Sequence, residues 1–319
     1  MEIVTNFSGR RHFLRVASVL LGSVASITVP GLLSAQQPQV EAIRLSDKAL
    51  FVQGADSNVL VVDSEAGLVM IDGGDADGYE ALISAVSGNF PGKSVRALIN
   101  THWHPEVTGA NLPLGKSGVE IIAHENTMLW LSTRVWQRWS DTVFPPLPRE
   151  ALPATAMFED GAVQLGEHKV QYGHMRNAHT DGDIWVYFED ENILVTGGLV
   201  SNGKWPVIDW WTGGYIGGML DGFVSLLDVP NRATRIVPAY GGIMTLDELR
   251  EQNQMYLTIF DRLHGMLIQS YSLNDVLAER PAAEFEAAMG DSTAFITQAF
   301  QSFQGRIRDP QNFRILNIP

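Results

Sequence analysis

The chain has 319 residues, 45% of them hydrophobic, a formal net charge of -14 and a pI near 4.9. This length can bury one large core or two modest ones, and the composition is too polar for a membrane protein. The acidic balance, without a basic run beyond the first fifteen residues, argues against nucleic acid as a partner. Cysteine is absent. Disulfides, zinc–thiolate sites and thiol nucleophiles are therefore excluded, and a metal must be held by His, Asp or Glu.

The first 35 residues have the pattern of an export signal. A basic segment at 9–15 precedes an apolar segment at 16–29 and a small-residue cleavage region that ends near Ala35. The pair Arg10-Arg11 followed by Phe13-Leu14 is typical of twin-arginine signals. The apolar segment is shorter than the roughly 20 residues that span a bilayer. We therefore expect a periplasmic mature protein with no membrane span after cleavage.

The mature chain begins as a series of short strands. Strand-like runs at 42–45, 50–53, 57–62 and 67–72 alternate with Gly/Asp turns. Helical periodicity follows at 79–87, and a compact apolar strand is predicted at 95–100.

The second half repeats this pattern. Strands are predicted at 163–165, 169–174, 184–188, 193–196 and 235–238, with a helix at 219–227. Two β-rich halves with helices outside predict an α/β fold, an αβ/βα sandwich over residues 36–245. The Trp- and Pro-rich stretch 125–160 is expected to be part helix and part long irregular loop. Residues 246–319 are expected to form helices packed on the same domain, at 247–269 and around 281–289.

The segment with the most chemical information is Thr101-His102-Trp103-His104-Pro105-Glu106. Alternate residues of an extended chain point the same way, so His102 and His104 can face one ion. His179 lies before another predicted strand, in a Gly/Asp turn. Three neutral imidazoles and a water form an open catalytic zinc position, where the ion lowers the pKa of the water.

The wider sequence around these histidines resembles the metallo-β-lactamase superfamily. The matching segments are 101–111, Asp72-Gly73-Gly74, Ala178-His179-Thr180, 195–199 and 237–241. They occur in the order typical of the family, from about residue 42 to 245. The resemblance implies a four-layer αβ/βα sandwich, a zinc cofactor and metal-assisted hydrolysis. It also implies that Asp72 is a buried carboxylate that supports the metal loop.

The same resemblance shows where this chain departs from the family. The His-x-His-x-Asp-His motif becomes His102-x-His104-x-Glu106-Val107. The bridging aspartate of the family is replaced by Gly198, and its last histidine by Tyr240. The first metal site thus keeps His102, His104 and His179, whereas the second keeps at most a glutamate. We therefore expect one zinc ion.

These departures leave two interpretations open. In the first, the chain is a mononuclear zinc hydrolase acting on a neutral or apolar ester, lactone or amide of small size. Glu106 is then the general base, and Tyr240 donates a hydrogen bond to the developing oxyanion. In the second, the chain is an exported protein that only binds a small hydrophobic molecule. A metal carrier is a weaker third possibility.

Several further residues have less specific interpretations. His124 and His174 are expected in the core, or as hydrogen-bond donors to metal ligands, and His168 and His264 at the surface. Asp183 is expected to cap its turn or orient a neighbouring backbone. Six tryptophans either wall an apolar pocket or pack in the core: Trp130, Trp136, Trp139, Trp205, Trp210 and Trp211.

Overall fold

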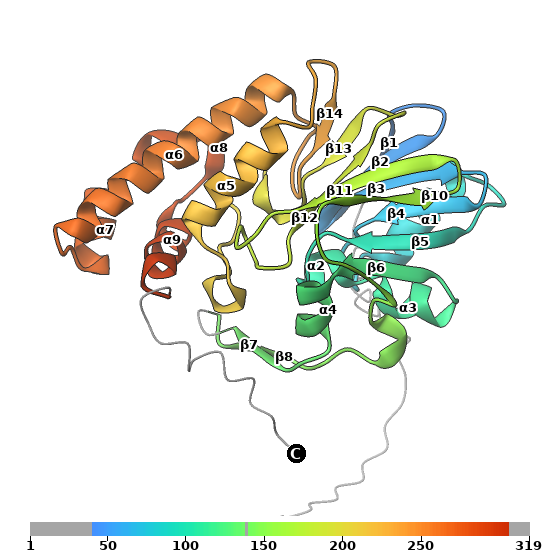
Figure 1. The fold of residues 1–319 in the computed structure, drawn as a ribbon, viewed down its shortest axis with the longest axis horizontal. Helices are drawn as coiled ribbons and strands as arrows, with labels where there is room; N and C mark the ends of the chain where they lie inside the picture. Colours follow the sequence, from blue (N-terminus) through green and yellow to red (C-terminus); the bar gives the residue numbers. More distant parts are fainter. Residues whose placement is uncertain (1–39, 138–139, 306–319) are drawn as a thin grey trace, which may run out of the picture. The chain divides into compact units, whose positions relative to one another are not determined.

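The computed structural model describes residues 40–137 and 140–305. The predicted signal peptide and Trp139 lie outside these residues. Within the described ranges no helix combines the length and the apolarity needed to cross a membrane. The elements form two large sheets with helices around them (Figure 1).

The first sheet has seven strands in the order β1-β2-β3-β4-β5-β6-β9. Strands β1 to β4 are an antiparallel meander, whereas β4, β5, β6 and β9 are parallel. The carboxyl ends of the parallel strands meet at one edge, where β5 delivers the first histidine motif. The bounds are β1 Glu41–Arg44, β2 Ala49–Ala55, β3 Ser57–Ser64, β4 Gly67–Ile71, β5 Val95–Asn100, β6 Glu120–His124 and β9 Thr155–Met157.

The second sheet has five strands in the order β10-β11-β12-β13-β14. All neighbours are antiparallel except β13 and β14. The loop between β11 and β12 carries His179. The bounds are β10 Gly161–Leu165, β11 His168–His174, β12 Ile184–Phe188, β13 Ile193–Val195 and β14 Arg235–Val237.

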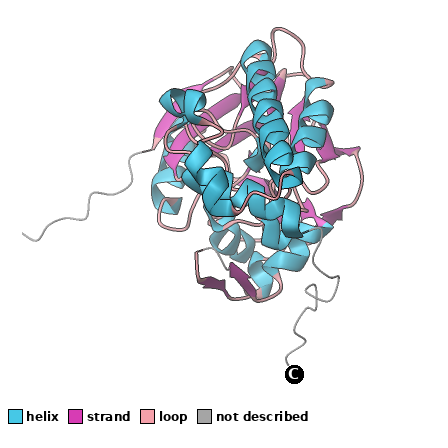
Figure 2. Ribbon diagram, turned by 90° about the vertical axis from the view of Figure 1, so that its left-hand side faces the viewer, coloured by secondary structure: helices cyan, strands magenta, loops and turns pink. Residues whose placement is uncertain are grey.

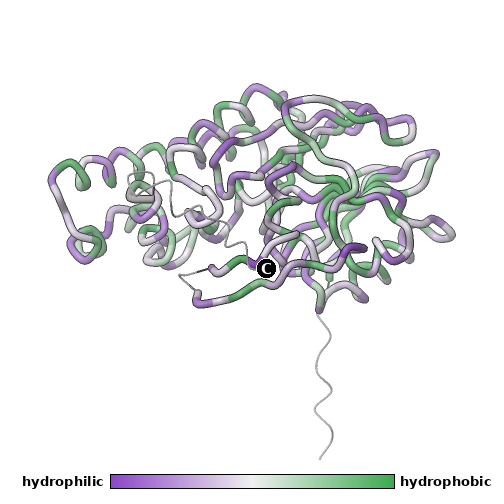
Figure 3. Tube along the Cα trace, turned by 60° about the horizontal axis from the view of Figure 1, so that its bottom comes forward, coloured by the Kyte–Doolittle hydropathy of each residue, from purple (hydrophilic) through white to green (hydrophobic). Residues whose placement is uncertain are grey.

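Apolar side chains fill the space between the sheets and both outer faces. Strand β3 shows this arrangement, because Leu60 and Val62 pack between the sheets while Val59 and Val61 face helix α1. Both sets are fully buried, which explains why the strand is a continuous apolar run. Apolar segments gather along the strands in Figure 3. The layers are helix, sheet, sheet and helix, so the predicted αβ/βα sandwich is confirmed.

Helices α1 and α3 cover the first sheet, and the second sheet is covered by α5 together with α6, α7 and α9. Figure 2 shows helices lying in front of the strands. The described helices after residue 245 thus share one apolar core with β12, β13 and β14. The bounds are α1 Tyr79–Asn89, α2 Pro105–Thr108, α3 Asn111–Lys116, α4 Glu125–Leu131, α5 Ile216–Leu227, α6 Leu246–Ile268, α7 Leu273–Glu279, α8 Glu286–Met289 and α9 Thr293–Gly305.

The structure differs from the sequence-based expectation in two segments. The stretch 125–160 contains α4 and β9 and also a small hairpin, β7 Val135–Gln137 with β8 Thr142–Phe144. The helix expected around 281–289 is present as a 3-10 turn, Ala283–Phe285, that continues into α8, and helix α7, which precedes it, was not identified from the sequence. Helix α7 begins after a capping box formed by Ser272 and Asp275, because these side chains satisfy backbone N–H groups of the first turn.

Candidate metal centre

Three buried histidines converge at the edge where the two sheets meet. His102 follows β5, His104 is the residue before α2, and His179 lies between β11 and β12. One ring nitrogen from each lies within 4.8 Å of the other two. The ring centroids are 4.5 to 5.0 Å apart, and the rings are nearly perpendicular. The grouping predicted from the sequence is therefore present in the structure.

A hydrogen-bond relay sets the tautomer of His102. The Thr101 hydroxyl donates to Asp72 Oδ2 at 2.8 Å, and its oxygen, Oγ1, lies 3.0 Å from His102 Nδ1. Because that hydroxyl proton is already donated, Thr101 must accept the proton on Nδ1. This leaves the lone pair on Nε2, a buried atom with no hydrogen-bond partner. Asp72 thus supports the metal loop, as the family resemblance implied.

Carboxylates orient the other two rings. Asp209 Oδ2 lies 3.0 Å from His104 Nε2, which leaves Nδ1 as the possible ligand atom. Asp183 Oδ1 lies 3.0 Å from His179 Nδ1, which leaves Nε2. Asp183 also accepts from the backbone N–H of His179 at 2.6 Å, so the prediction that it orients a neighbouring backbone is confirmed. Such partners fix ring orientation in metal sites.

This arrangement fits a metal ion. Each imidazole has one nitrogen bonded to a protein oxygen and the other facing the shared space, and His102 Nε2 is an orphaned buried acceptor. Buried polar atoms are nearly always paired, so a buried ring nitrogen without a protein partner is suited to bind a metal ion. Three imidazoles with no thiolate match an open zinc position.

The surroundings of the histidines shift their pKa values in different directions. Burial, together with the neighbouring imidazoles, holds the pKa of His102 well below its usual range. Burial also opposes charge on His104, but Glu106 and Asp209 outweigh it and raise its pKa to about 10. The same two carboxylates would favour a cation bound to Nδ1, and a metal ion bound there would take the place of the second ring proton.

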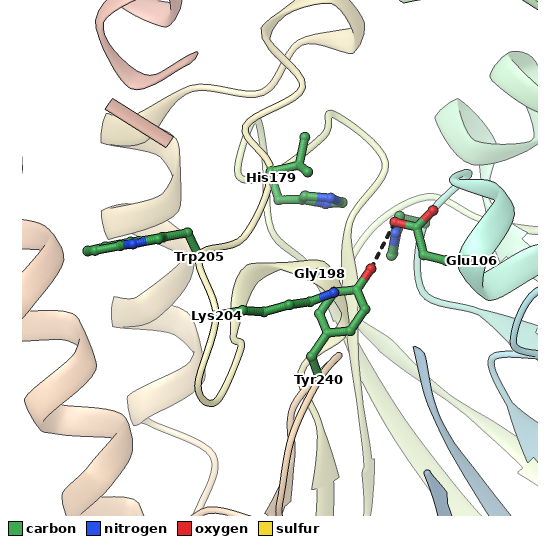
Figure 4. A pocket seen from close by; sticks show the side chains of 8 residues that line it. Glu106, His179, Gly198, Lys204, Trp205 and Tyr240 are labelled. Atoms are coloured by element: carbon green, nitrogen blue, oxygen red, sulfur yellow. Dashed lines mark hydrogen bonds between the residues drawn. The ribbon is translucent and has the colours of Figure 1, made fainter. Parts of the chain in front are cut away.

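Beside the histidines, Glu106 and Tyr240 form a pair. The Tyr240 hydroxyl donates to Glu106 Oε1 at 3.2 Å (Figure 4). Glu106 Oε1 also lies 3.5 Å from His104 Nδ1. Burial acts to raise the pKa of Glu106, but His104 outweighs it and the pKa falls below its usual range. Burial and then Glu106 raise the pKa of Tyr240. Glu106 is therefore an anion, and Tyr240 keeps its proton as a donor.

Gly198 lies directly under the ring of His179. A Cβ atom built on Gly198 would be 2.4 Å from Cε1 and 2.5 Å from Nδ1 of that ring. Real carbon contacts are longer, so any side chain at this position would displace His179. A carboxylate side chain at position 198 is therefore incompatible with the present position of the His179 ring, which belongs to the first metal site.

A small pocket opens over these residues. It encloses about 80 Å³ and is lined by His102, Glu106, His179, Gly198, Lys204, Trp205, Val207 and Tyr240. A pocket of this size holds a few water molecules, so it accommodates a small reacting group beside the histidines. The rest of a substrate must extend past its rim.

The profile of the metallo-beta-lactamase superfamily matches residues 52–240. This is more than half of the chain and includes every residue of the site described above. The chain belongs to the metallo-beta-lactamase superfamily. Known structures of this fold resemble the protein over most of its described length.

A metallo-beta-lactamase from Pontibacter korlensis shares 19% identity at a TM-score of 0.56, covering 69% of this chain and 99% of its own. The DIM-1 metallo-beta-lactamase shares 15% identity at a TM-score of 0.55, covering 69% and 98%. The inverting sec-alkylsulfatase Pisa1 from Pseudomonas sp. shares 14% identity at a TM-score of 0.65, covering 88% of this chain. This chain spans about half of that sulfatase, 52%. At these identities the likeness shows the fold alone.

The other sequence-based candidates lie away from the metal-binding histidines of this superfamily member. His124 and His174 stack on each other, with ring centroids 3.7 Å apart, and bond to the backbone oxygens of Phe158 and Asp181. His264 is exposed as predicted. The surface position expected for His168 is wrong, because its ring is fully buried between Asp190 and the backbone oxygen of Asp63.

The tryptophans do not form one wall. Among the described ones only Trp205 lines the pocket. Trp130 and Trp211 pack with Trp103 in a separate cluster, and Trp136 is 47% exposed on the hairpin. Core or loop packing therefore describes most of them better than a binding wall.

Sequence reasoning missed the importance of two residues. Neither Asp209 nor Lys204 lies in a motif that indicates a metal or substrate site. Asp209 is the more informative case, since a carboxylate in an apolar, Trp-rich segment must find a partner if it is buried.

Proposed function

We propose that this protein is a mononuclear, zinc-dependent hydrolase that cleaves a small ester, lactone or amide with an activated water. The observation that carries the proposal is the set of three inward-facing ring nitrogens, His102 Nε2, His104 Nδ1 and His179 Nε2, with a carboxylate beside them. Zinc held there would supply a Lewis acid and a water made acidic enough to attack near neutral pH.

Glu106 is proposed as the general base. Its carboxylate is ionised and lies beside the ligand atom of His104. It can therefore accept the proton of the attacking water and later return it to the leaving group. Tyr240 holds Oε1 of this carboxylate in place.

Tyr240 is proposed to have a second part in the reaction. Its hydroxyl bonds to Glu106 while that group is an anion. Once Glu106 has taken up a proton, its oxygens are weaker acceptors, and the phenol proton can turn to the negative charge that develops on the substrate. Tyr240 thus first positions the Glu106 carboxylate and then stabilises the negative charge on the substrate.

The missing second-site ligands favour the competing interpretation of a protein that only binds its ligand. Gly198, Val107 and Tyr240 offer no carboxylate or imidazole where the family holds its second ion. One metal with a base is nevertheless sufficient for hydrolysis, and the sulfatase and lactamase neighbours are hydrolases by name. The carboxylate of Glu106 beside the histidines makes hydrolysis the better-supported proposal.

The test begins with metal analysis of the purified wild type beside His179→Ala. The proposal expects one zinc per wild-type chain, none in the variant, and loss of activity on removal of the metal by a chelator. An ester, lactone, amide and sulfate-ester panel then searches for turnover. Absence of metal from both proteins would reject the proposal, and bound zinc with no turnover across the panel would favour the binding protein.

We also propose that the protein is exported to the periplasm. The twin-arginine-like pattern of residues 9–35 is the support for this proposal. Mass spectrometry of the protein from a periplasmic fraction tests it. A mature N-terminus near Gln36 is expected, and an uncleaved leader on cytoplasmic protein would contradict it.

A further inference from the structure

A lysine side chain reaches over the pocket from an exposed loop. Lys204 lies between Gly198 and Trp210, and its Nζ is 3.1 Å from the centroid of the Tyr240 ring. Figure 4 shows the side chain running from the loop to that ring. Among the described residues no carboxylate lies within ion-pair distance of Nζ. The ammonium therefore contacts an aromatic face and keeps its hydrogen-bonding capacity for another partner.

The loop that carries Lys204 is fixed by the C-terminal helices. Three hydrogen bonds and one aromatic stack connect it to segments after residue 250. They are Gln252 Nε2 to Ser201 O at 2.7 Å, Trp205 Nε1 to Gly290 O at 2.8 Å, Ile208 N to Gln298 Oε1 at 3.0 Å, and the Trp205–Phe295 rings at 4.7 Å. The lysine thus projects from a loop that is anchored on both sides, which reduces the ordering entropy of any contact it makes.

The charge of Lys204 lies near the position that lost its metal ligands. The pocket that it lines also contains Gly198 and Tyr240, which replace the bridging aspartate and the last histidine of the family pattern. Partial desolvation of its ammonium group at the pocket lowers the pKa of Lys204, although the side chain as a whole is exposed, and Asp56 and Glu106 oppose that effect. These are the two carboxylates within electrostatic range, and neither forms an ion pair with it.

We propose that Lys204 binds an acidic group of the substrate, a carboxylate, sulfate or phosphate, and replaces part of the positive charge that a second metal would bring. This inference rests on the proposed hydrolase function. It changes the substrate class from a neutral ester to one with an acidic group near the scissile bond. A charge-assisted hydrogen bond from an anchored ammonium is the physical basis.

The experiment measures ligand binding to the zinc-loaded protein by calorimetry, without turnover. The probes are hexyl sulfate, hexyl phosphate and hexanoate, with hexanol and hexylamine as the neutral and cationic comparisons. The variants are Lys204→Met, Lys204→Arg and Lys169→Met, the last being an exposed lysine far from the pocket lining. Because Lys204 is exposed, its substitution is not expected to prevent folding.

We expect at least one of the anionic probes to bind, and to bind more tightly than hexanol and hexylamine. Lys204→Met should raise the dissociation constant of that probe about tenfold, as expected for the loss of a hydrogen bond to a charged group. Lys204→Arg should retain most of the affinity, and Lys169→Met all of it. The anion with the largest loss in Lys204→Met identifies the acidic group.

Equal binding of hexanol and the anions, or an unchanged anion affinity in Lys204→Met, would overturn the inference. So would a Lys204→Met variant with a lower melting temperature but wild-type anion binding, because the lysine would then only balance Asp56 and Glu106. The result is separable from the hydrolase proposal. Lys204-dependent anion binding without turnover would reject hydrolysis alone, and turnover of neutral esters without anion preference would reject the lysine role alone.

Discussion

The two metal positions of the family differ in this chain in the residues that they retain. At the first, three imidazoles are each oriented by a protein oxygen, on Thr101, Asp209 and Asp183. At the second, Gly198 and Tyr240 replace ligands, and Glu106 bonds to a tyrosine. The comparison shows that the partners of a ligand indicate a working site more clearly than the ligand alone does. The first position keeps the complete set of partners, and the second does not.

Replacing the proposed base tests whether the second position still takes part in the chemistry. Glu106→Gln should lower the turnover of a substrate found in the panel by about a hundredfold to ten-thousandfold, because the amide cannot accept the proton of water. Zinc content should stay at one per chain. Tyr240→Phe should have a smaller effect, since it leaves the base in place and removes only the hydroxyl that positions Glu106 and then stabilises the developing negative charge. Full activity in Glu106→Gln would reject Glu106 as the general base. Loss of zinc from the same variant would indicate that Glu106 is a metal ligand.

Changing a partner of the first site tests the importance of ligand orientation. Asp209→Asn keeps the shape but turns an N–H group toward His104 Nε2, so we expect zinc affinity to fall by about tenfold to a hundredfold. Competition with a chromophoric chelator measures the affinity. Asp221→Asn, an exposed change on α5, is the control. Equal affinities in the two variants would show that Asp209 does not orient the ring.

Restoring the family carboxylate asks whether the second position can simply be rebuilt. Gly198→Asp should fail to add a second zinc, and should weaken the first by on the order of tenfold, because the new Cβ displaces His179. Gly242→Asp, at an exposed glycine with no heavy atom near the built Cβ, is the matched control. Two zinc ions per Gly198→Asp chain would show that the His179 ring is not held in place.

The smallest expected effect concerns the stacked pair away from the metal. Burial and then the His174 ring lower the pKa of His124 to about 4, whereas an unfolded histidine titrates near 6.5. Between these values the unfolded chain binds a proton that the native chain does not. The free energy of unfolding should therefore fall as the pH drops from about 6.5 to 4.

Urea denaturation at both ends of this range measures that loss of stability. His124→Asn preserves hydrogen-bonding groups for Asn126 and Phe158 and should reduce the acid-induced loss by about 1 kcal/mol, after allowance for solvent screening. His264→Asn, an exposed change, should leave it as in the wild type. An identical acid sensitivity of His124→Asn and wild type would contradict the assignment.

Local sequence patterns were sufficient for much of the fold. The strand 95–100 and the strand 184–188 have their predicted bounds, since apolar runs ended by turn residues are unambiguous. Strand β6 was not identified, because its five residues run directly into α4 at Glu125 without a Gly or Pro between them. The domain boundaries proposed at residues 35 and 245 stay predictions.

The metal ligands were predictable and their partners were not. His102 and His104 could be predicted as ligands because alternate residues at the end of one strand point to the same side. Asp209 meets His104 across 105 residues of sequence, and no spacing rule connects them. The prediction for His168 was wrong for the same reason, since its burial depends on an aspartate that another loop contributes.

A zinc-soaked crystal measured at the zinc absorption edge tests the central claim most directly. We predict a single anomalous peak per chain, at about 2.0–2.1 Å from His102 Nε2, His104 Nδ1 and His179 Nε2, with none between Glu106 and Tyr240. A second peak beside Glu106, or an empty three-histidine site, would contradict it.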